Sequence, residues 1–368
     1  MPTLSALYGQ QAAIAALRRS LQADELPGAY LFVGTPGVGK AGLAHALAQA
    51  ATCLSPVQSP FDACGVCDSC RRAESGAQPE IVTVYPAGEQ LQIWQFWNRD
   101  NKPSGVLSHT LAYAPTIGRR RVYIIENADV LNASAANSLL KVLEEPPAYA
   151  LFVLLASHPA RVLPTIASRC QLVRLRALTS EELTGYLCAT ALVPPDRAAM
   201  LAAYTEGRIG QAIQLARNGL VGQEIGQVLD YAESLPEAPR VRALRLAEQL
   251  RKLAAQTRAL IGEDPPEPPG DADGGTANPK ERAGRRQIAA VFDLLVAFYR
   301  DLLTLRTCGA KARVVNTERV DILTRLAQTG TPERWSGCLD ALLLARRRLD
   351  ANANVALVTE VLLMSLVG

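Results

Sequence analysis

Short apolar runs separated by helical segments fill the first half of the chain. Five of these runs consist mainly of Val, Ile, Leu, Ala and aromatic residues, at positions 29–33, 81–85, 121–125, 151–156 and 172–175. Strands that are apolar at nearly every position are buried on both faces, as in parallel sheets. Residues 10–23 instead place Ile14, Leu17 and Leu21 on one helical face, and residues 41–52 read as an Ala-rich helix. The pattern predicts an α/β fold in which helices cover both faces of a five-stranded parallel sheet.

After residue 178 the pattern becomes purely helical. Thr179-Ser-Glu-Glu182 has the form of a capping box that starts a helix. We expect a small three-helix domain over residues 179–221 and a further helical domain over residues 222–368. Within the latter, the Pro-, Gly- and acid-rich residues 262–284 are expected to form a mobile loop. A long amphipathic helix is expected over residues 287–306.

The composition narrows the class of protein. The chain has 368 residues, enough for two or three domains, with 49% hydrophobic residues and a mean hydropathy of +0.07. No apolar run approaches the roughly 20 residues that span a bilayer, and the first residues lack the plan of a signal peptide. We therefore expect a cytoplasmic protein without membrane contact. The net charge of +3 permits nucleic-acid contact without requiring it, and an aromatic share of 5% is low for a base-stacking platform.

A glycine-rich loop follows the first predicted strand and precedes a helix. It matches the Gly-x4-Gly-Lys pattern of a phosphate-binding loop, and this context makes a chance Gly-rich turn the weaker alternative. The backbone amides of such a loop surround phosphates, and the lysine reaches the outermost ones. The candidate nucleotide-binding residues are Gly34, Thr35, Pro36, Gly37, Val38, Gly39, Lys40 and Ala41.

Two positions that ATP hydrolysis needs are altered. Ala41 stands where a Ser or Thr hydroxyl would bind Mg²⁺, and Asn127 follows Glu126 where adjacent Asp and Glu are usual. Glu126 can still approach a metal, but the amide of Asn127 cannot act as a base to position water. We expect the loop to bind ATP or ADP weakly, if at all, with weak or absent turnover.

A cluster of cysteines lies in the segment 53–70. Four of the eight cysteines fall there, three of them at turn spacing: Cys53, Cys64, Cys67 and Cys70. Four thiolates suit a tetrahedral Zn²⁺ ion, and in a chain of this length they do not read as a secreted disulfide framework. Redox dithiols and unliganded cysteines are the alternatives. Because no histidine ligand or open position is apparent, we expect one structural zinc ion.

Ser168-Arg169-Cys170 lies between the last two predicted strands. An arginine at the end of a helix and about to enter a strand can project from the edge of a domain. Its guanidinium is always charged and offers a rigid fork of donors, which suits a phosphate presented by a neighbouring chain. A solvated surface arginine is the alternative. Together with the altered nucleotide loop, Arg169 indicates a subunit that completes the active site of a neighbour.

These motifs resemble the AAA+ clamp-loader family of the bacterial DNA polymerase III holoenzyme, and within it the delta-prime group. The resemblance covers nearly the whole chain and is carried by the glycine-rich loop, the cysteine insert and residues 124–129, 135–147, 164–170, 299–303 and 352–360. It implies an AAA+ P-loop domain over residues 1–178 with a zinc module at 53–70, a lid over 179–221 and an oligomerisation collar over 222–368. The amphipathic helices of the last part would fit a monomeric bundle equally well.

The resemblance also implies a role for Arg169. In this family the corresponding arginine acts in trans on ATP held by an adjacent motor subunit. Two departures stand out: Gly210 occupies the place of a lid arginine found in motor subunits, with Arg208 displaced by two residues, and residues 90–113 do not match the family pattern. We assign no role to residues 90–113.

Three functions follow as hypotheses. The leading one is a delta-prime-like member of a hetero-pentameric clamp loader, a component of the polymerase holoenzyme that is not itself an active ATPase. Its partners would be gamma/tau-like motor subunits and a delta subunit, and indirectly the sliding clamp and primer-template DNA. The first alternative is a gamma/tau-like subunit that itself hydrolyses ATP. The second, a stand-alone zinc-dependent nucleic-acid-binding protein, is weakened by the modest charge and few aromatic residues.

Overall fold

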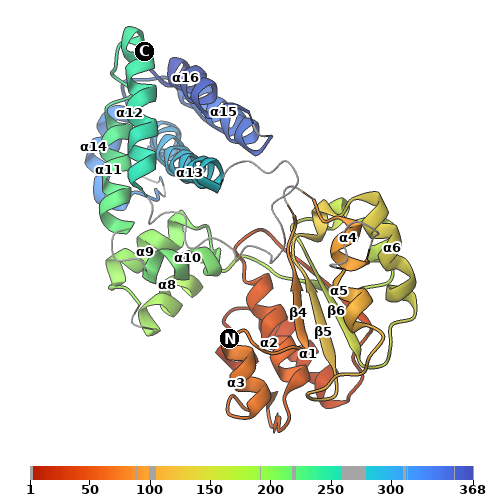
Figure 1. Cartoon of the computed structure of the whole chain (residues 1–368). Helices are drawn as coiled ribbons and strands as arrows, with labels where there is room; N and C mark the ends of the chain where they lie inside the picture. The colour runs from red at the N-terminus through yellow and green to blue at the C-terminus, as the bar shows by residue number, and fades with distance from the viewer. Residues whose placement is uncertain are drawn as a thin grey trace. The chain divides into compact units, whose positions relative to one another are not determined.

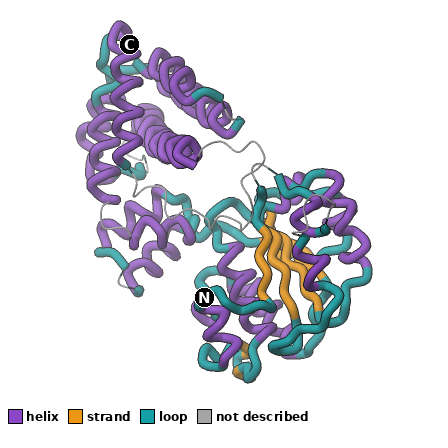
Figure 2. The backbone as a smooth tube through the Cα atoms, in the orientation of Figure 1, coloured by secondary structure: helices purple, strands orange, loops and turns teal. Residues whose placement is uncertain are grey.

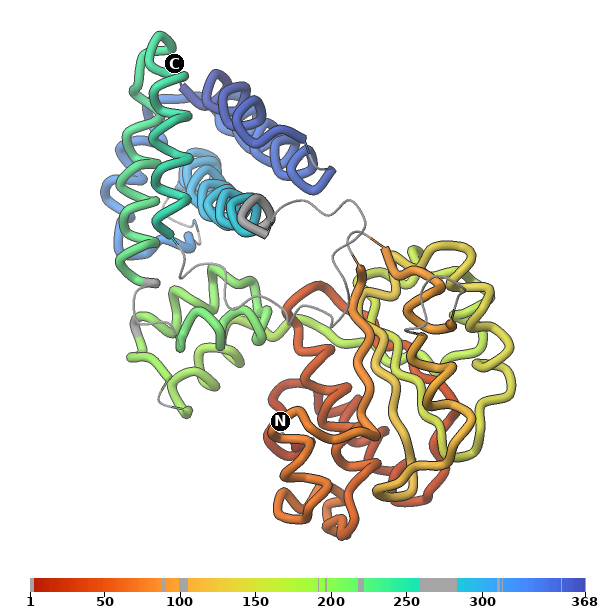
Figure 3. Tube along the Cα trace, in the orientation of Figure 1, coloured from red at the N-terminus to blue at the C-terminus, as the bar shows by residue number. Residues whose placement is uncertain are grey.

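The described residues form two compact units. The structure is a computed structural model and describes residues 3–87, 90–98, 105–190, 192–217, 221–257, 279–309, 312, 314–351 and 353–367. The first unit contains the residues up to Glu182 together with Gly207–Gly210, and the second contains Leu183–Glu206 and the described residues from Gln211 onward. The first holds the sheet and the second is helical (Figures 1 and 3).

The first unit is built on one five-stranded parallel sheet, as the sequence predicts. Its strands are β1 (Ala29–Val33), β4 (Ile81–Val84), β5 (Arg121–Ile125), β6 (Ala150–Ala156) and β7 (Gln171–Arg174), in the order β4-β5-β6-β1-β7. Every residue of β1, β5 and β6 is buried. These three strands lie inside the sheet and are covered on both faces, which explains their lack of polar alternation.

Helices cover both faces of the sheet, and this confirms the predicted α/β fold (Figure 2). On one face, Tyr30 and Phe32 of β1 pack in the core that holds α1 (Gln11–Gln22) and α2 (Lys40–Thr52). On the other, Leu31 and Val33 pack in the core that holds α6 (Ala133–Glu144). The two cores take alternate residues of one strand because successive side chains point to opposite faces. The shorter elements of this unit are η1 (Leu4–Ala6), β2 (Val57–Gln58), β3 (Phe61–Asp62), α3 (Asp68–Glu74), α4 (Ile93–Phe96), α5 (Val106–Thr110), η2 (Ala128–Val130), η3 (Pro159–Arg161) and α7 (Pro164–Ala167).

A buried ion pair fastens the chain between α5 and β5. Arg121 Nε donates to Glu80 Oε2 at 2.6 Å, and the two side chains are only 7% and 1% exposed. Arg121 also donates to the carbonyl oxygens of Thr110 and, at 2.9 Å, Tyr113, while Glu80 accepts from the backbone N–H of Thr116 at 2.6 Å. Burial opposes the charge on Arg121, but hydrogen bonding and attraction to Glu80 outweigh it and raise the pKa of the guanidinium. The end of the segment 90–113, to which the sequence assigns no role, is thus anchored to the sheet.

The second unit consists of helices packed around one long helix. That helix, α13 (Pro279–Cys308), packs against α11, α12, α14 and α15, and α16 lies against α12 and α15. The fully buried aromatic side chains of the second unit include Phe292, Phe298, Tyr299 and Trp335. The elements that follow the sheet are α8 (Ser180–Ala189), α9 (Pro195–Tyr204), α10 (Ile209–Arg217), α11 (Val221–Glu233), η4 (Arg240–Arg242), α12 (Ala243–Gln256), α13, η7 (Thr317–Arg319), α14 (Val320–Ala327), α15 (Pro332–Asp350) and α16 (Val355–Leu366).

The motif at 299–303 has a structural explanation in this unit. Asp301 is only 1% exposed, and its carboxylate accepts from the backbone N–H groups of Val315 at 3.0 Å and Asn316 at 2.9 Å. It also accepts from Asn316 Nδ2 at 2.7 Å. A buried carboxylate with this many donors fixes the turn that leads into α14.

Element bounds differ from the sequence-based expectation mainly in the helical unit. The helix expected over 287–306 begins at Pro279 and ends at Cys308. Residues 262–278 of the expected mobile loop lie outside the described residues, and residues 279–284 belong to α13. The division into a P-loop domain, a lid over 179–221 and a collar over 222–368 stays a prediction.

Candidate functional site

The glycine-rich loop stands at the carboxyl end of β1. A Cβ at Gly34 would lie 2.6 Å from the carbonyl oxygen of Leu175, so only glycine fits there. Gly37 and Gly39 have φ values of 84° and 99°, a region that favours glycine. α2 begins at Lys40, directly after the loop. The strand, loop and helix therefore have the arrangement that brings backbone amides to a phosphate.

The loop is bonded to groups of its own unit. Lys40 Nζ donates to the carbonyl oxygens of Gly34 at 2.6 Å and Thr35 at 3.1 Å. The N–H of Gly210, in the first turn of α10, donates to the carbonyl oxygen of Gly37 at 2.7 Å. A Cβ at Gly210 would lie only 3.0 Å from that oxygen. This close approach favours glycine at position 210.

Two carboxylates follow β5 at the same edge of the sheet. Burial lowers the pKa of Lys40, and the charges of Asp129 and Glu126 oppose that change. Burial also raises the pKa of Glu126. Asp129 has a second role, because its carboxylate accepts from the N–H groups of Ser157 at 2.6 Å and His158 at 3.2 Å. It therefore holds the chain that leaves β6.

The positions altered in the sequence lie within this arrangement. Ala41 is the second residue of α2 and offers only a methyl group where Mg²⁺ would need a hydroxyl. Asn127 has a left-handed backbone, with φ 52°, and separates Glu126 from η2. The loop amides and Lys40 can hold a phosphate once Lys40 leaves its carbonyl partners. Nucleotide binding and the absence of turnover stay predictions.

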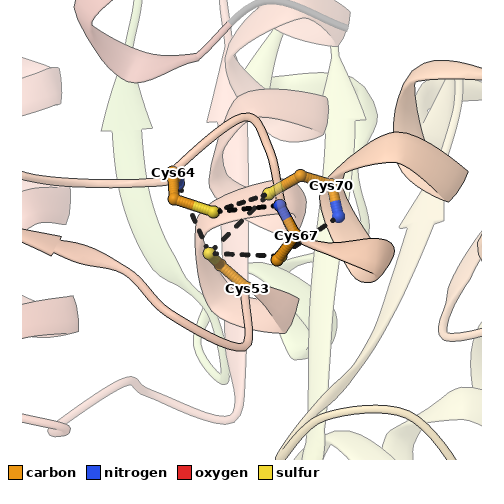
Figure 4. A group of neighbouring side chains, drawn as sticks. All are labelled: Cys53, Cys64, Cys67 and Cys70. Atoms are coloured by element: carbon orange, nitrogen blue, oxygen red, sulfur yellow. Dashed lines mark hydrogen bonds between the residues drawn. The ribbon is translucent and has the colours of Figure 1, made fainter.

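The four clustered cysteines converge on one point (Figure 4). Their sulfur atoms all lie within 4.8 Å of one another, and the Sγ–Sγ distances from Cys53 to Cys67 and Cys70 are 3.9 and 3.7 Å. Cys64 Sγ lies 4.0 Å from Cys70 Sγ. A tetrahedral ZnS₄ centre with bonds of about 2.3 Å has edges of about 3.8 Å, so the spacing fits this geometry. The cluster can hold a metal ion.

Backbone amides support the sulfur atoms as they would support thiolates. The N–H groups of Cys64, Cys67 and Cys70 donate to the preceding cysteine sulfur in the cluster, at 3.4, 3.3 and 3.5 Å. Burial raises the pKa of Cys53 and Cys70. It also acts to raise the pKa of Cys67, but hydrogen bonds, the largest from the N–H groups of Cys70 and Leu54, outweigh it and lower that pKa to about 6. Metal ligation needs the thiolate form.

The cysteine module is tied to the rest of its unit through Asp62. The Asp62 carboxylate accepts from the N–H groups of Leu4 at 3.0 Å and Ser5 at 2.7 Å, and it pairs with Arg18 at 3.3 Å. Cys67 is the N-cap of α3, and the hydroxyl of Ser69 in that helix donates to the carbonyl oxygen of Thr52 at 2.8 Å. The module is therefore a packed part of the fold.

Arg169 lies in the turn between α7 and β7, as expected. Its Nε donates to Glu144 Oε1 at 2.8 Å, its Nη2 donates to the same oxygen, and its Nη1 donates to the carbonyl oxygen of Thr165 at 2.7 Å. The side chains of Arg169 and Glu144 are 31% and 48% exposed. Sequence reasoning missed Glu144, although it stands in the Glu-Glu-Pro-Pro stretch that carries the family resemblance.

Comparisons with known proteins bear on this combination of sites. A family model described as "DNA polymerase III, delta subunit" matches residues 9–179. The chain is 30% identical to DNA polymerase III subunit delta′ of Bacillus subtilis over 353 residues. This alignment covers 95% of this chain and 94% of that protein. The chain belongs to the DNA polymerase III delta-prime family of clamp-loader subunits.

Two further proteins are similar to a smaller extent. DNA polymerase III subunit tau of Escherichia coli is 33% identical over 269 residues, but these are 71% of this chain and only 40% of that protein. A solved gamma subunit-related protein of Thermotoga maritima aligns over 94% of this chain and 97% of its own, with 16% identity and a TM-score of 0.38 that adds nothing to the assignment. Within the described part of this delta-prime family member, no helix is long and apolar enough to cross a membrane.

Proposed function

We propose that this delta-prime family member supplies Arg169 in trans to ATP bound by an adjacent motor subunit of a clamp loader. The parallel pairing of β1 with β7 carries the proposal. In its register Tyr30 pairs with Gln171, so Arg169 is level with Gly28, six residues before Gly34. At about 3.3 Å per residue, Arg169 is about 20 Å along the strands from its own loop. Its guanidinium cannot serve that loop and is available to another chain.

The surface around Arg169 supports an interface at this edge. Among the described residues, β7 is an edge strand that pairs with β1 alone. Leu163 and Leu172, on either side of Arg169 in sequence, are 39% and 42% exposed. Apolar side chains of this size beside a charged anchor are typical of protein interfaces. An arginine of this kind stabilises the charge that develops on the transferred phosphoryl group.

The cysteine cluster supports one structural Zn²⁺ ion in the same chain. Four sulfur ligands at tetrahedral spacing leave no position for water or substrate. When bound, zinc would supply folding stability to the module and no reaction chemistry.

The chain's own nucleotide loop supports weak nucleotide binding without turnover. Lys40 and Gly210 donate hydrogen bonds to carbonyl oxygens of the loop, and Ala41 lacks a metal-binding hydroxyl. ATP or ADP would have to displace the Lys40 contacts to bind.

The proposed partners are gamma/tau-like motor subunits and a delta subunit in a hetero-pentamer, and indirectly the sliding clamp and primer-template DNA. The helical unit offers an uncovered apolar stripe on α16, where Leu357, Val361 and Met364 are 62%, 50% and 52% exposed. Their spacing places them on one helical face. This stripe supports contact of the helical unit with other subunits.

Reconstitution with motor and delta subunits tests the trans role. Motor subunits whose own trans arginines are replaced by alanine would leave one ATP site that depends on this chain. Arg169→Ala should then leave the complex assembled but lower its clamp- and DNA-stimulated ATPase by about 10³-fold or more. Arg169→Lys should be a poor substitute because an ammonium lacks the planar fork. Arg19→Ala, which removes an exposed arginine on α1, is the control. Unchanged ATPase and clamp loading in Arg169→Ala would refute the proposal.

A gamma/tau-like motor is the second candidate. It is favoured by the strand–loop–helix geometry at Lys40 with Glu126 and Asp129 close by. Steady-state ATP hydrolysis by the isolated chain that is abolished by Lys40→Ala would support it.

A further inference from the structure

The end of α6 is held firmly beside Arg169. Leu143 is 4% exposed and packs in the core on that face of the sheet. Pro146, two residues after the helix, fills the space next to Gly28, where a Cβ would lie 2.2 Å from the proline ring. Glu144 and Glu145 lie between these anchors, so the backbone at Glu144 is held near Gly28, the residue before β1.

Glu144 accepts from one edge of the Arg169 guanidinium. Nε donates to Glu144 Oε1 at 2.8 Å, and Nη2 donates to the same oxygen. Nη1 donates to the carbonyl oxygen of Thr165 at 2.7 Å. Guanidinium has five N–H donors, so these contacts hold the group in one orientation without using all of its donors. Nη1 also donates to Ser168 Oγ at 3.5 Å, so the second N–H of Nη2 is the donor left for a further acceptor.

We propose that Glu144 is a positioning residue that holds the Arg169 guanidinium for a phosphate of the neighbouring subunit; this inference rests on the trans role proposed above. A long side chain at a half-exposed site otherwise samples many rotamers, and ordering it in advance lowers the loss on binding. Misplacement of a catalytic group by about 1 Å can cost up to about 100-fold in rate. Glu144 would therefore affect the rate of ATP hydrolysis by setting the position of the Arg169 guanidinium.

The exposure of the pair makes this role testable. Half-exposed ion pairs contribute little to stability, so a chain without Glu144 should fold. Glu145, the C-cap of the same helix, is exposed, and its side chain accepts no hydrogen bond from the described residues. Glu145→Ala is therefore a matched control that removes the same charge from the same turn.

The experiment is a double-mutant cycle in the reconstituted loader in which only the Arg169-dependent ATP site remains. Glu144→Ala should lower kcat of the stimulated ATPase about tenfold with little change in KM. Glu144→Gln keeps an oxygen acceptor for Nε–H and should recover most of this loss, and Glu145→Ala should match wild type. In the Arg169→Ala background, Glu144→Ala should have no further effect, because it acts through the arginine.

Three results would overturn the proposal. Glu144→Ala with wild-type kcat would show that the orientation is unimportant, and a faster variant would show that Glu144 masks the arginine. An added loss in the Arg169→Ala background, or loss of assembly on gel filtration, would show that Glu144 acts on the interface independently. If Arg169→Ala itself has no effect, the trans role fails and the positioning role falls with it.

Discussion

Replacing Glu80 by glutamine is expected to destabilise the sheet-containing unit. The Glu80 carboxylate is the partner of Arg121, whose side chain is only 7% exposed. In the native chain, Thr116 N donates to Glu80 Oε1 at 2.6 Å, and a glutamine oxygen can still accept this bond. The substitution removes the negative charge beside the guanidinium of Arg121. Arg121 is then left buried and charged, with only neutral acceptors.

The structure sets the size of this effect. Breaking a buried ion pair by removing one partner costs about 3–5 kcal/mol. Arg121 keeps the carbonyl oxygens of Thr110 and Tyr113 as acceptors, so the lower end of that range applies. We expect the free energy of unfolding of this unit to fall by about 3 kcal/mol.

Urea unfolding at pH 7, combined with hydrogen exchange at the amides of β4 and β5, measures this loss. Exchange is needed because a chain with two compact units need not unfold in one transition. Glu74→Gln is the control, since Glu74 is exposed at the end of α3, and it should change stability by less than about 0.5 kcal/mol. A loss of under about 1 kcal/mol for Glu80→Gln would refute the view that the pair fastens this segment.

Three further predictions concern metal, nucleotide and pH. Purified protein should contain one Zn²⁺ per chain, and Cys64→Ser should lower zinc content and thermal stability; a metal-free chain after reducing purification would contradict this. Calorimetric titration should give weak or no ATP and ADP binding, weakened further by Lys40→Ala, and turnover at the rate of a motor subunit would refute it. Burial acts to raise the pKa of Asp62, but hydrogen bonds from Ser5, Ala63 and Leu4 outweigh it and lower that pKa in the folded state. The stability from Asp62 is therefore present above about pH 4 and lost as pH falls through the folded pKa. Asp62→Asn should flatten the acid limb of the stability–pH curve, and an unchanged limb would count against this.

Local patterns were enough to predict the sheet and some of the helix ends. β1 and β5 have the predicted bounds because apolar runs buried on both faces stand out from their neighbours. The capping box at the start of α8 is also confirmed: Thr179 Oγ1 accepts from Glu182 N at 3.1 Å, and Glu182 Oε2 accepts from Thr179 N at 2.9 Å. The first turns of α13 were missed because residues 279–286 carry mostly charged residues and no apolar periodicity.

The candidate site was also only partly predictable from the sequence. Cysteine spacing within one short segment was enough to indicate the cluster that the structure brings together. The pairing of Arg169 with Glu144 joins residues 25 positions apart, and the contact of Gly210 with Gly37 joins residues on different elements. Such contacts depend on how α6, α7 and α10 pack, and spacing along one chain does not encode them. Both residues stand in motifs that carry the family resemblance, but their pairing is not visible in the sequence.

The register of β1 against β7 gives the sheet-containing unit two unlike sides. One side carries Arg169, for which a trans role is proposed, and the far side carries the glycine-rich loop, whose carbonyl groups accept from Lys40 and Gly210. If Arg169 acts in trans as proposed, subunits with this polarity would join head to tail, each arginine meeting the next loop. If the loop also lacks turnover as predicted, a ring made of this chain alone would hydrolyse no ATP. The two proposals together would place the chain at one end of a row of motor subunits, where it activates a neighbour on one side only.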